Sequence, residues 1–428
     1  MKILLINSGI NVYNEQPPIG LLYLAAYLEK YSHVVKIVNQ PCGENYETAI
    51  EEFKPDFVGI TGTTRTIMDG YNCATYCKHK GIWTVIGGIH ATAIPQEALR
   101  FADTVVIGEG EKAFLEIIKN PQKGIMQGEP LDNLDELPIP AWHLINMEYY
   151  CTRNEGILSF AMNSRIGCLL TSRGCPYKCT YCYNSFRKSK IRYSSPEKVI
   201  EEIKHLITNY KVNVICFLED NFFVNKVRLK KICKLIKKNN LKFIWSANGR
   251  VDNVDEKILK IVHEAGCVQI AFGMESGSQR ILDILKKGTT IEHAKHAIEI
   301  CDKEGIIISA SFMFNTPTET IEDIMMTVNF IKDNNIDGPI GFCITIPFPG
   351  TEIWNWCWEK KKIPNAINWS LFDYQKMPVK INDISSEILN PLLNTVGIFC
   401  ANVFNSRIFS RISKMGVVYE SMFGKSGC

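Results

Sequence analysis

The sequence lacks two features that would assign a whole class of protein at once. It has no apolar stretch as long as a membrane-spanning helix, and its first residues, MKILLINSGI, hold one lysine and a short apolar run typical of a strand. It also lacks any block of like charge, since 48 basic residues face 45 acidic ones for a net charge of +3. These absences argue against a membrane span, a secretory signal and a nucleic-acid-binding arm. We therefore expect a cytoplasmic protein without a nucleic-acid partner.

Cysteine is not scarce, because the chain of 428 residues contains 16. In a small secreted protein this number would predict a disulfide framework, but here the cysteines are scattered through the predicted strands and helices of a long chain. Most are expected to be buried thiols. With 46% hydrophobic and 22% charged residues, the composition is that of a globular protein with two or three domains.

Short apolar runs alternate with amphipathic segments from residue 1 to about 118, as in KILLIN, VVKIVN and FVGITG. This alternation predicts a Rossmann-like, doubly wound parallel sheet, which we place at 1–125 and follow by a linker rich in Pro, Gly and Asn at 126–162. Glycines follow the predicted strands, at the edge where open parallel sheets bind ligands. These glycines are Gly62, Gly87, Gly88, Gly108 and Gly110.

A second alternation occupies 163–350 and contains six β/α units, two fewer than a complete eight-fold barrel. It predicts an open, partial (β/α)6 barrel. The region 351–428 is expected to be mostly helical, with apolar residues from Val396 to Ile412 along one helix face and Arg407 and Arg411 nearby. Two interpretations of that helix stay open: it packs on the barrel, or its basic face makes a peripheral contact with a membrane or a lipid substrate.

Three cysteines with the spacing C-x3-C-x2-C lie in the segment TSRGCPYKCTYCYN, directly after a predicted strand. A [4Fe–4S] cluster normally takes one thiolate per iron, so Cys175, Cys179 and Cys182 leave one iron open to chelate a substrate. Structural zinc is the alternative, but it requires four ligands, and the sequence has no second C-x2-C pair. The loop predicts a three-thiolate cluster at the end of a barrel strand, where catalytic groups collect.

This loop resembles the cluster motif of the radical S-adenosylmethionine (SAM) superfamily, with Tyr181 as the aromatic residue before the third cysteine. The resemblance implies that the amino and carboxylate groups of SAM chelate the open iron. It further implies that an electron from the reduced cluster cleaves SAM to a 5′-deoxyadenosyl radical. An external electron donor such as flavodoxin or ferredoxin and a small-molecule substrate follow from the same resemblance.

Further barrel segments resemble the SAM-binding parts of that superfamily. In FLEDNFF, Glu219 and Asp220 are expected to receive the methionine ammonium, because a cation in a dry site needs an anionic or carbonyl acceptor. Glu275 and Ser276 of GMESGSQR are expected to bind the ribose hydroxyls, and Arg250 of SANGRVD is expected to meet the SAM carboxylate. An ordinary acidic turn and a surface salt bridge are the structural alternatives.

The segment FMFNTPTET resembles a family segment that usually reads F-x-x-G-x-P-x-E-T, but Asn315 stands at the glycine position. Asparagine tolerates a positive φ better than most residues, so we expect the turn to form. Whether the change weakens SAM binding stays open at this point.

The first domain resembles the cobalamin-binding domain that precedes the barrel in one subset of radical SAM enzymes. The resemblance is carried in order by PPIGLLYLAAYL, VGITGTTRT, VIGGIHATAIPQEAL and VVIGEGEKAF, and later by PFPGTEI at 347–353. None of the eight histidines has an Asp two residues before it, so the D-x-H-x-x-G segment that brings histidine to cobalt is absent. We expect the lower face of cobalt to lie against Thr63, Thr64 and Arg65, and His90 to contact the corrin edge unless it is simply satisfied within its loop. Glu109 completes the expected cobalamin-binding residues.

Cobalamin beside a radical generator implies, by this resemblance, an enzyme that methylates an unactivated carbon or phosphorus through a 5′-deoxyadenosyl radical and methylcobalamin. A non-methylating enzyme for oxidative cyclisation or ring rearrangement is the first alternative, and a non-catalytic cobalamin-binding sensor is the second. Oligomeric state is not encoded in any motif, and we expect a monomer.

Four tryptophans near Tyr374 either flank an apolar, planar substrate or form the packing core of the tail. These are Trp354, Trp356, Trp358 and Trp369.

Overall fold

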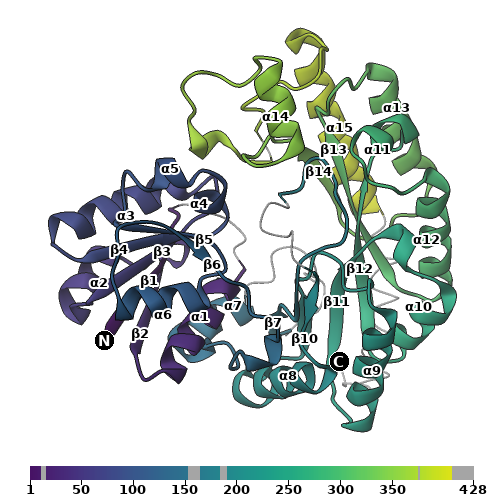
Figure 1. Ribbon diagram of the computed structural model, residues 1–428. Coiled ribbons are helices and arrows are strands. Elements are labelled where there is room, and N and C mark those ends of the chain that lie inside the picture. The colour runs from purple at the N-terminus through teal and green to yellow at the C-terminus, as the bar shows by residue number, and fades with distance from the viewer. Residues whose placement is uncertain (11–15, 153–163, 184–189, 375, 407–428) are drawn as a thin grey trace. The chain divides into compact units, whose positions relative to one another are not determined.

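The first sheet contains six parallel strands in the order β2-β1-β3-β4-β5-β6 (Figure 1). The computed structural model describes residues 1–10, 16–152, 164–183, 190–374 and 376–406. Residues 3–6 of β1 are completely buried, which explains why KILLIN is a continuous apolar run: helices cover both faces of a parallel sheet. The strands are β1 (Lys2–Asn7), β2 (Val34–Asn39), β3 (Phe57–Thr61), β4 (Trp83–Gly87), β5 (Thr104–Gly108) and β6 (Gly124–Gly128).

Helices connect these strands and cover the sheet. α1 and α6 contact each other, whereas α3 contacts β3 and β4. α2 begins where the Asn45 side chain accepts a hydrogen bond from the Thr48 amide, a typical N-terminal cap. The helices are α1 (Ile19–Lys30), α2 (Tyr46–Phe53), α3 (Ile67–His79), α4 (Ile89–Ala93), α5 (Pro95–Ala98), α6 (Glu111–Lys119) and α7 (Met147–Thr152).

The second sheet is also parallel, in the order β14-β13-β12-β11-β10-β7, and it curls into a partial barrel with helices outside (Figure 1). Within the described chain its edge strands are β7 and β14, so the barrel is open. Its strands are β7 (Ile166–Leu169), β10 (Val214–Phe217), β11 (Ile244–Gly249), β12 (Cys267–Glu275), β13 (Ile307–Phe314) and β14 (Ile340–Ile344). The short strands β8 (Ser172–Arg173) and β9 (Arg192–Tyr193) lie before and after the cysteine loop.

Amphipathic helices cover the barrel strands. α8 shows why they begin where they do, since Ser195 caps the Lys198 amide and Pro196 occupies the first turn. The barrel helices are α8 (Pro196–Tyr210), α9 (Lys226–Lys238), α10 (Glu256–His263), α11 (Gln279–Ile284), α12 (Ile291–Lys303) and α13 (Ile321–Asp333). The predicted doubly wound sheet, partial barrel and helical C-terminal region are all confirmed.

The chain forms two compact units that are not continuous in sequence. The first contains residues 1–150, 183–193 and 347–378, and the second contains 151–182, 194–346 and the chain from Val379. The C-terminal region is therefore divided: α14 (Glu352–Glu359) and the 3-10 helix η5 (Trp369–Leu371) belong to the first unit, and α15 (Ser386–Ser406) belongs to the second.

α15 packs on the barrel, where it contacts β14 and α13. Of the predicted apolar face, Val396 is buried, whereas Phe399 and Val403 are half-buried. The buried side chains recur at helical spacing but begin earlier, and they are Leu389, Leu393, Val396 and Cys400. The basic residues Arg407 and Arg411 and the apolar Ile408 and Ile412 lie outside the described residues. No helix in the part of the chain that the structure describes is long and apolar enough to cross a membrane.

Candidate active site

The three cysteines of the C-x3-C-x2-C loop differ from most other cysteines in their exposure. Ten of the fifteen described cysteines are buried, whereas Cys175, Cys179 and Cys182 are half-buried. Backbone hydrogen bonds shape the loop: the Cys182 amide donates to the Cys179 carbonyl at 3.1 Å, and the Thr180 amide donates to the Leu285 carbonyl at 3.0 Å. The loop thus presents accessible thiols at a fixed place beside the segment that follows α11.

The donor set of this loop determines which kind of metal group it could hold. Within the described residues, no three His, Cys, Asp or Glu side chains converge closely enough to hold one metal ion. Zinc needs all its thiolates about 2.3 Å from one centre. A [4Fe–4S] cluster instead takes each thiolate on a different iron, so its cysteines stand apart. Three thiols are the number that a [4Fe–4S] cluster with one open iron takes, whereas a closed structural zinc site takes four ligands.

Glu219 is a buried carboxylate at the carboxyl end of β10, with only 1% of its surface exposed. Its Oε1 accepts hydrogen bonds from the amide and the hydroxyl of Thr171, but its buried Oε2 has no hydrogen-bond partner. Burial raises the pKa of this carboxyl. A cation placed at Oε2 would satisfy the orphaned oxygen, as expected for the methionine ammonium. Asp220, the next residue, is exposed.

Glu275 forms a buried cluster with Tyr181 and Lys287. Its Oε1 accepts hydrogen bonds from the Tyr181 hydroxyl at 2.8 Å and from the Lys287 ammonium at 2.7 Å. Burial, followed by the negative charge of Glu275, raises the pKa of Tyr181. Glu275 has φ +64°, an unusual backbone conformation for its residue type, and it lies where the register between β12 and β13 shifts. The strand end therefore turns the carboxylate toward the cysteine loop.

Arg250 joins the end of β11 to the same loop. One guanidinium nitrogen lies 4.0 Å from the Cys179 sulfur, and the guanidinium lies 3.5 Å from the centre of the Tyr177 ring. Two other nitrogens pair with the Asp252 carboxylate at 3.0 Å each, and one of them also donates to the Lys287 carbonyl at 2.6 Å. Arg250 is buried, so this ion pair is not the surface salt bridge that the sequence left open.

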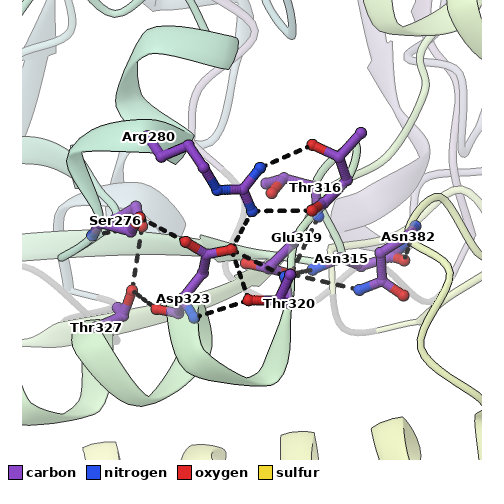
Figure 2. A network of polar contacts seen from close by, with 11 residues as sticks. Ser276, Arg280, Asn315, Thr316, Glu319, Thr320, Asp323, Thr327 and Asn382 are labelled. Atoms are coloured by element: carbon purple, nitrogen blue, oxygen red, sulfur yellow. Dashed lines mark hydrogen bonds and ion pairs between the residues drawn. The ribbon is translucent and has the colours of Figure 1, made fainter.

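Asn315 keeps the left-handed turn that glycine forms in the related segment, with φ +65°. Its side chain ties the end of β13 to residues 379–382: Nδ2 donates to the Val379 carbonyl at 2.9 Å and Oδ1 accepts from the Ile381 amide at 2.8 Å. The Asn315 amide donates to the Glu319 carboxylate at 2.7 Å. Figure 2 shows this cluster, which also contains Asn382. The substitution of glycine thus adds a structural clamp.

Ser276 lies in the other half of the network in Figure 2. Its hydroxyl is 3.1 Å from the Thr327 hydroxyl and accepts from the Ser278 amide at 3.1 Å. The Ser278 hydroxyl donates to Asp323 at 2.6 Å, and Asp323 pairs with Arg280. Ser276 is buried, and these bonds connect it to α13.

In the first unit, the loops after β3 and β4 lie side by side because these strands are neighbours. Gly88 has φ +90°, and a Cβ there would overlap the Thr61 hydroxyl, so only glycine fits. A Cβ on Gly62 would lie 2.6 Å from the Ser8 hydroxyl. The next strand, β5, brings its own loop to the same edge. The candidate residues at this edge are Gly62, Thr63, Thr64, Arg65, Gly87, Gly88, Gly108, Glu109 and Gly110.

This edge also exposes large apolar side chains. Ile10 follows β1, Met68 lies in the first turn of α3 and Ile89 follows β4, and they are 58%, 42% and 40% exposed. Because β1, β3 and β4 are adjacent, the three side chains extend along one sheet edge. An exposed apolar strip beside glycine loops suits a flat, largely apolar ligand such as a corrin ring.

His90 and Glu109 are engaged by the protein at this edge. The His90 side chain is completely buried, with Nδ1 3.2 Å from the Thr64 hydroxyl and Nε2 3.6 Å from Glu97 Oε1. Among the residues that the structure describes, Nε2 is buried without a hydrogen-bond partner, so the ring is only partly satisfied by these contacts. Glu109 forms a two-pronged ion pair with Arg192.

Gly350 of the PFPGTEI segment packs against Tyr183, the residue that directly follows the third cysteine. Gly350 has φ +85°, and a Cβ on it would overlap the Tyr183 ring. The turn before α14 therefore packs on the residue that follows the cysteine loop.

Of the four tryptophans noted in the sequence, Trp369 is buried with 3% of its surface exposed, whereas Trp358 is 60% exposed. The tail aromatics thus provide both a packing core and an exposed surface.

Sequence reasoning missed Lys287 and Glu97. Lys287 is one of many lysines, and only its position beside a glycine after the GMESGSQR segment set it apart. Glu97 accepts the indole N–H of Trp369 at 2.9 Å across 272 residues, a contact that no local pattern reveals.

Two parts of the chain match models of known protein families. A model of the radical SAM superfamily matches residues 169–331, and a model of the B12 binding domain matches residues 8–118. An uncharacterized methyltransferase of Pyrococcus horikoshii is 34% identical over 428 residues, covering 92% of this chain and 91% of that protein. The anaerobic magnesium-protoporphyrin IX monomethyl ester cyclase of Rubrivivax gelatinosus is 27% identical, with coverage of 88% and 72%. The cytidylyl-2-hydroxyethylphosphonate methyltransferase of Streptomyces wedmorensis is 26% identical, with coverage of 83% and 81%.

Two solved structures share the fold. The cobalamin-dependent radical enzyme OxsB superposes with a TM-score of 0.72 at 15% identity, covering 99% of this chain and 73% of that one. The methyltransferase TsrM from Kitasatospora setae, solved with cobalamin and a [4Fe–4S] cluster, gives a TM-score of 0.68 at 17% identity, with coverage of 85% and 79%.

Proposed function

Because this chain belongs to the radical SAM superfamily, in the group whose barrel follows a B12-binding domain, we propose that it is a methyltransferase acting on an unactivated carbon or on phosphorus. Its cofactors are a [4Fe–4S] cluster, SAM and cobalamin. Like other radical SAM enzymes, it needs an electron donor and a small-molecule substrate. The observation that carries the proposal is one loop of three half-buried thiols in the same chain as a B12-binding domain.

The described side chains supply distinct parts of this chemistry. Cys175, Cys179 and Cys182 would hold the cluster, which supplies the electron that cleaves SAM. Glu219 would accept the methionine ammonium at its orphaned oxygen. Arg250, beside Cys179, would bind the SAM carboxylate.

Glu275 and Ser276 would orient the ribose, although the Ser276 hydroxyl is already bonded within the protein. Lys287 holds Glu275 in place. The protein's contribution is to fix these groups and to exclude competing hydrogen donors.

Cobalamin is proposed to bind at the carboxyl edge of the first sheet. The glycines there allow close approach, and Ile10, Met68 and Ile89 offer an apolar surface. Thr63, Thr64 and Arg65 are proposed to face the ring. We propose the cytoplasm as the compartment, because a reducing environment keeps the thiols of a chain with 16 cysteines available for a cluster.

For the substrate we propose an apolar, planar molecule. Exposed aromatic side chains in the tail, Trp358 and Tyr374, support this class. The cyclase of Rubrivivax gelatinosus is named for a tetrapyrrole, which is such a molecule. The relative from Streptomyces wedmorensis is named for a phosphonate, and it supports phosphorus as the alternative acceptor.

A non-methylating enzyme is the second candidate, and it is favoured by the 27% identity to that cyclase. One experiment separates the candidates. The protein is purified without oxygen, reconstituted with iron, sulfide and hydroxocobalamin, and given reductant, methyl-deuterated SAM and magnesium-protoporphyrin IX monomethyl ester or a cytidylyl phosphonate.

S-adenosylhomocysteine, 5′-deoxyadenosine and a product carrying the deuterated methyl group would support the methyltransferase. Formation of 5′-deoxyadenosine with substrate consumed but no label transferred would favour the non-methylating enzyme. Cobalamin binding without any cleavage of SAM would favour the sensor.

A further inference from the structure

We propose that Trp369 and Asp373, in the tail segment 347–378, are positioning residues for the cobalamin site. They would fix the two loops after β3 and β4 against which cobalamin is proposed to bind. This inference rests on that proposed location of the cofactor. The segment is far from these loops in sequence, yet it belongs to the same compact unit.

The first link runs from Trp369 through Glu97 to both loops. The Trp369 indole N–H donates to Glu97 Oε1 at 2.9 Å, and the same oxygen lies 3.6 Å from His90 Nε2. The other ring nitrogen of His90 lies 3.2 Å from the Thr64 hydroxyl. Trp369 also packs edge-on against the His90 ring at 4.9 Å. One tail residue therefore touches α4, which directly follows β4, and reaches the loop after β3 through His90.

Glu97 is the central acceptor of this link. Tyr71 on α3 donates its hydroxyl to Glu97 Oε1 at 3.0 Å, and the Tyr71 ring stacks on Phe101 at 4.1 Å. Although burial opposes ionisation, the nearby His90 ring and the hydrogen bonds from Tyr71 and Trp369 hold the pKa of Glu97 below its usual value. The carboxylate is charged at neutral pH, so each donor bond to it is stronger than a neutral one.

The second link is the ion pair between Asp373 and Arg65. Arg65 Nη1 lies 2.9 Å from Asp373 Oδ2, and the two side chains are 35% and 14% exposed. A pair this close to solvent adds little to stability. Its effect is on charge and orientation, because Arg65 is the cation of the loop proposed to face cobalt. Asp373 both directs the guanidinium and offsets its charge.

The tail leaves the apolar strip of the edge open. η5 contacts α3, while Met68 on α3 and Leu371 in η5 are both 42% exposed. The segment thus holds the loops through polar groups and buried rings without covering their exposed apolar residues. A segment that served only to complete a hydrophobic core would not need bonds to two charged groups, Glu97 of α5 and Arg65 of the loop after β3.

The test measures hydroxocobalamin binding and the Co(II)/Co(I) midpoint potential of the reconstituted full chain. Trp369→Phe keeps the ring and removes the donor, and Trp83→Phe is its control, since it removes an indole bond to Thr104 at the opposite end of β4. Asp373→Asn, Asp373→Glu, Arg65→Gln and the double variant Arg65→Gln/Asp373→Asn test the ion pair. Ile89→Glu tests the location of the cofactor itself.

We expect Trp369→Phe to weaken hydroxocobalamin binding about tenfold and Trp83→Phe to leave it unchanged. Asp373→Asn leaves the Arg65 charge uncompensated, which favours the reduced cobalt and shifts the potential to a less negative value. Arg65→Gln shifts it the opposite way. The double variant returns close to the wild-type potential, and Asp373→Glu retains it.

Failure of the inference and failure of the cofactor location give different results. If Ile89→Glu weakens binding while Trp369→Phe and Asp373→Asn change neither affinity nor potential, the tail has no positioning role and the inference is overturned. If Ile89→Glu also leaves binding unchanged, cobalamin does not lie at this edge, and both proposals fail together.

Discussion

The ammonium of Lys287 donates a hydrogen bond of 2.7 Å to the carboxylate of Glu275, and both side chains are only 7% exposed. A buried pair of this kind is costly to break on one side, because the remaining charge stays in a dry site. Lys287→Met should therefore lower the free energy of unfolding by about 3 kcal/mol or more. Denaturant unfolding of Lys287→Met and of the double variant Lys287→Met/Glu275→Gln measures this. We expect the double variant to recover most of the loss, and equal losses in both would show that the pair is not coupled.

Replacing Glu219 should weaken SAM binding without lowering the stability of the protein. Because burial raises its pKa, the charged form is costly in the folded protein, and Glu219→Gln should not destabilise it. The same change should weaken SAM binding by about tenfold or more, since a bond between two charged groups becomes one between a charged and a neutral group. Equilibrium dialysis with labelled SAM tests this.

Two further variants make the Glu219 result specific. Glu202→Gln, a buried glutamate on α8, is the matched control and should bind SAM as the wild type does. Asp220→Asn separates the two candidates for the ammonium. If Asp220→Asn weakens binding and Glu219→Gln does not, the role belongs to Asp220.

Glu319 should make stability depend on pH. Burial raises its pKa from 4.5 to about 7. A group with a raised folded pKa contributes most stability while it is protonated, so this contribution is lost as pH rises from about 4.5 to about 7. The loss should be about 3 kcal/mol. In Glu319→Gln, the slope of the unfolding midpoint against pH over this range should disappear. The amide oxygen of the new glutamine still accepts hydrogen bonds from the Asn315 and Thr316 amides. The exposed change Glu322→Gln should retain the slope, and an unchanged slope in Glu319→Gln would contradict the assignment.

Comparing alanine substitutions at Gly350 and Gly43 separates the cost of backbone strain from the cost of steric overlap. Gly43 has nearly the same φ, +84° against +85°, but open space around a Cβ. Gly43→Ala should destabilise by about 1 kcal/mol through strain alone. Gly350→Ala should cost about 3 kcal/mol or more, because its Cβ also meets the Tyr183 ring. Denaturant unfolding and the iron content after reconstitution measure the loss in Gly350→Ala. Adding Tyr183→Ala to Gly350→Ala should relieve part of that loss. Equal losses at both glycines would rule out the contact with Tyr183.

Sequence patterns predicted the parts of the fold that depend on local repetition. KILLIN is an apolar run because its strand is covered on both faces, and such runs followed by helices predicted most strands of both sheets. The sixth strand of the first sheet, β6, was missed: its sequence GIMQG is partly exposed and overlaps the predicted linker. The spacing of the three cysteines could also be recognised in the sequence, because it is local and its chemistry needs no distant partner.

Other features depend on contacts between distant residues and left no local pattern. Trp369 meets Glu97 across 272 residues, so the tail segment 347–378 could not be assigned to the first unit from its composition. His90 follows two glycines at the start of α4, and its ring is buried against Thr64 and Glu97, contacts that no local pattern reveals. Asn315 departs from the glycine of the related segment, and only its bonds to residues 379–381 explain the change.

The central claim is that the three-cysteine loop holds a cluster whose open iron binds SAM. Electron paramagnetic resonance of the reduced, reconstituted protein with and without SAM tests this most directly, with Cys179→Ala as the control. We predict a [4Fe–4S] signal that changes when SAM is added to the wild type, and no such change in Cys179→Ala. A wild-type signal that SAM leaves unaltered, or zinc in place of iron in the purified protein, would contradict the account.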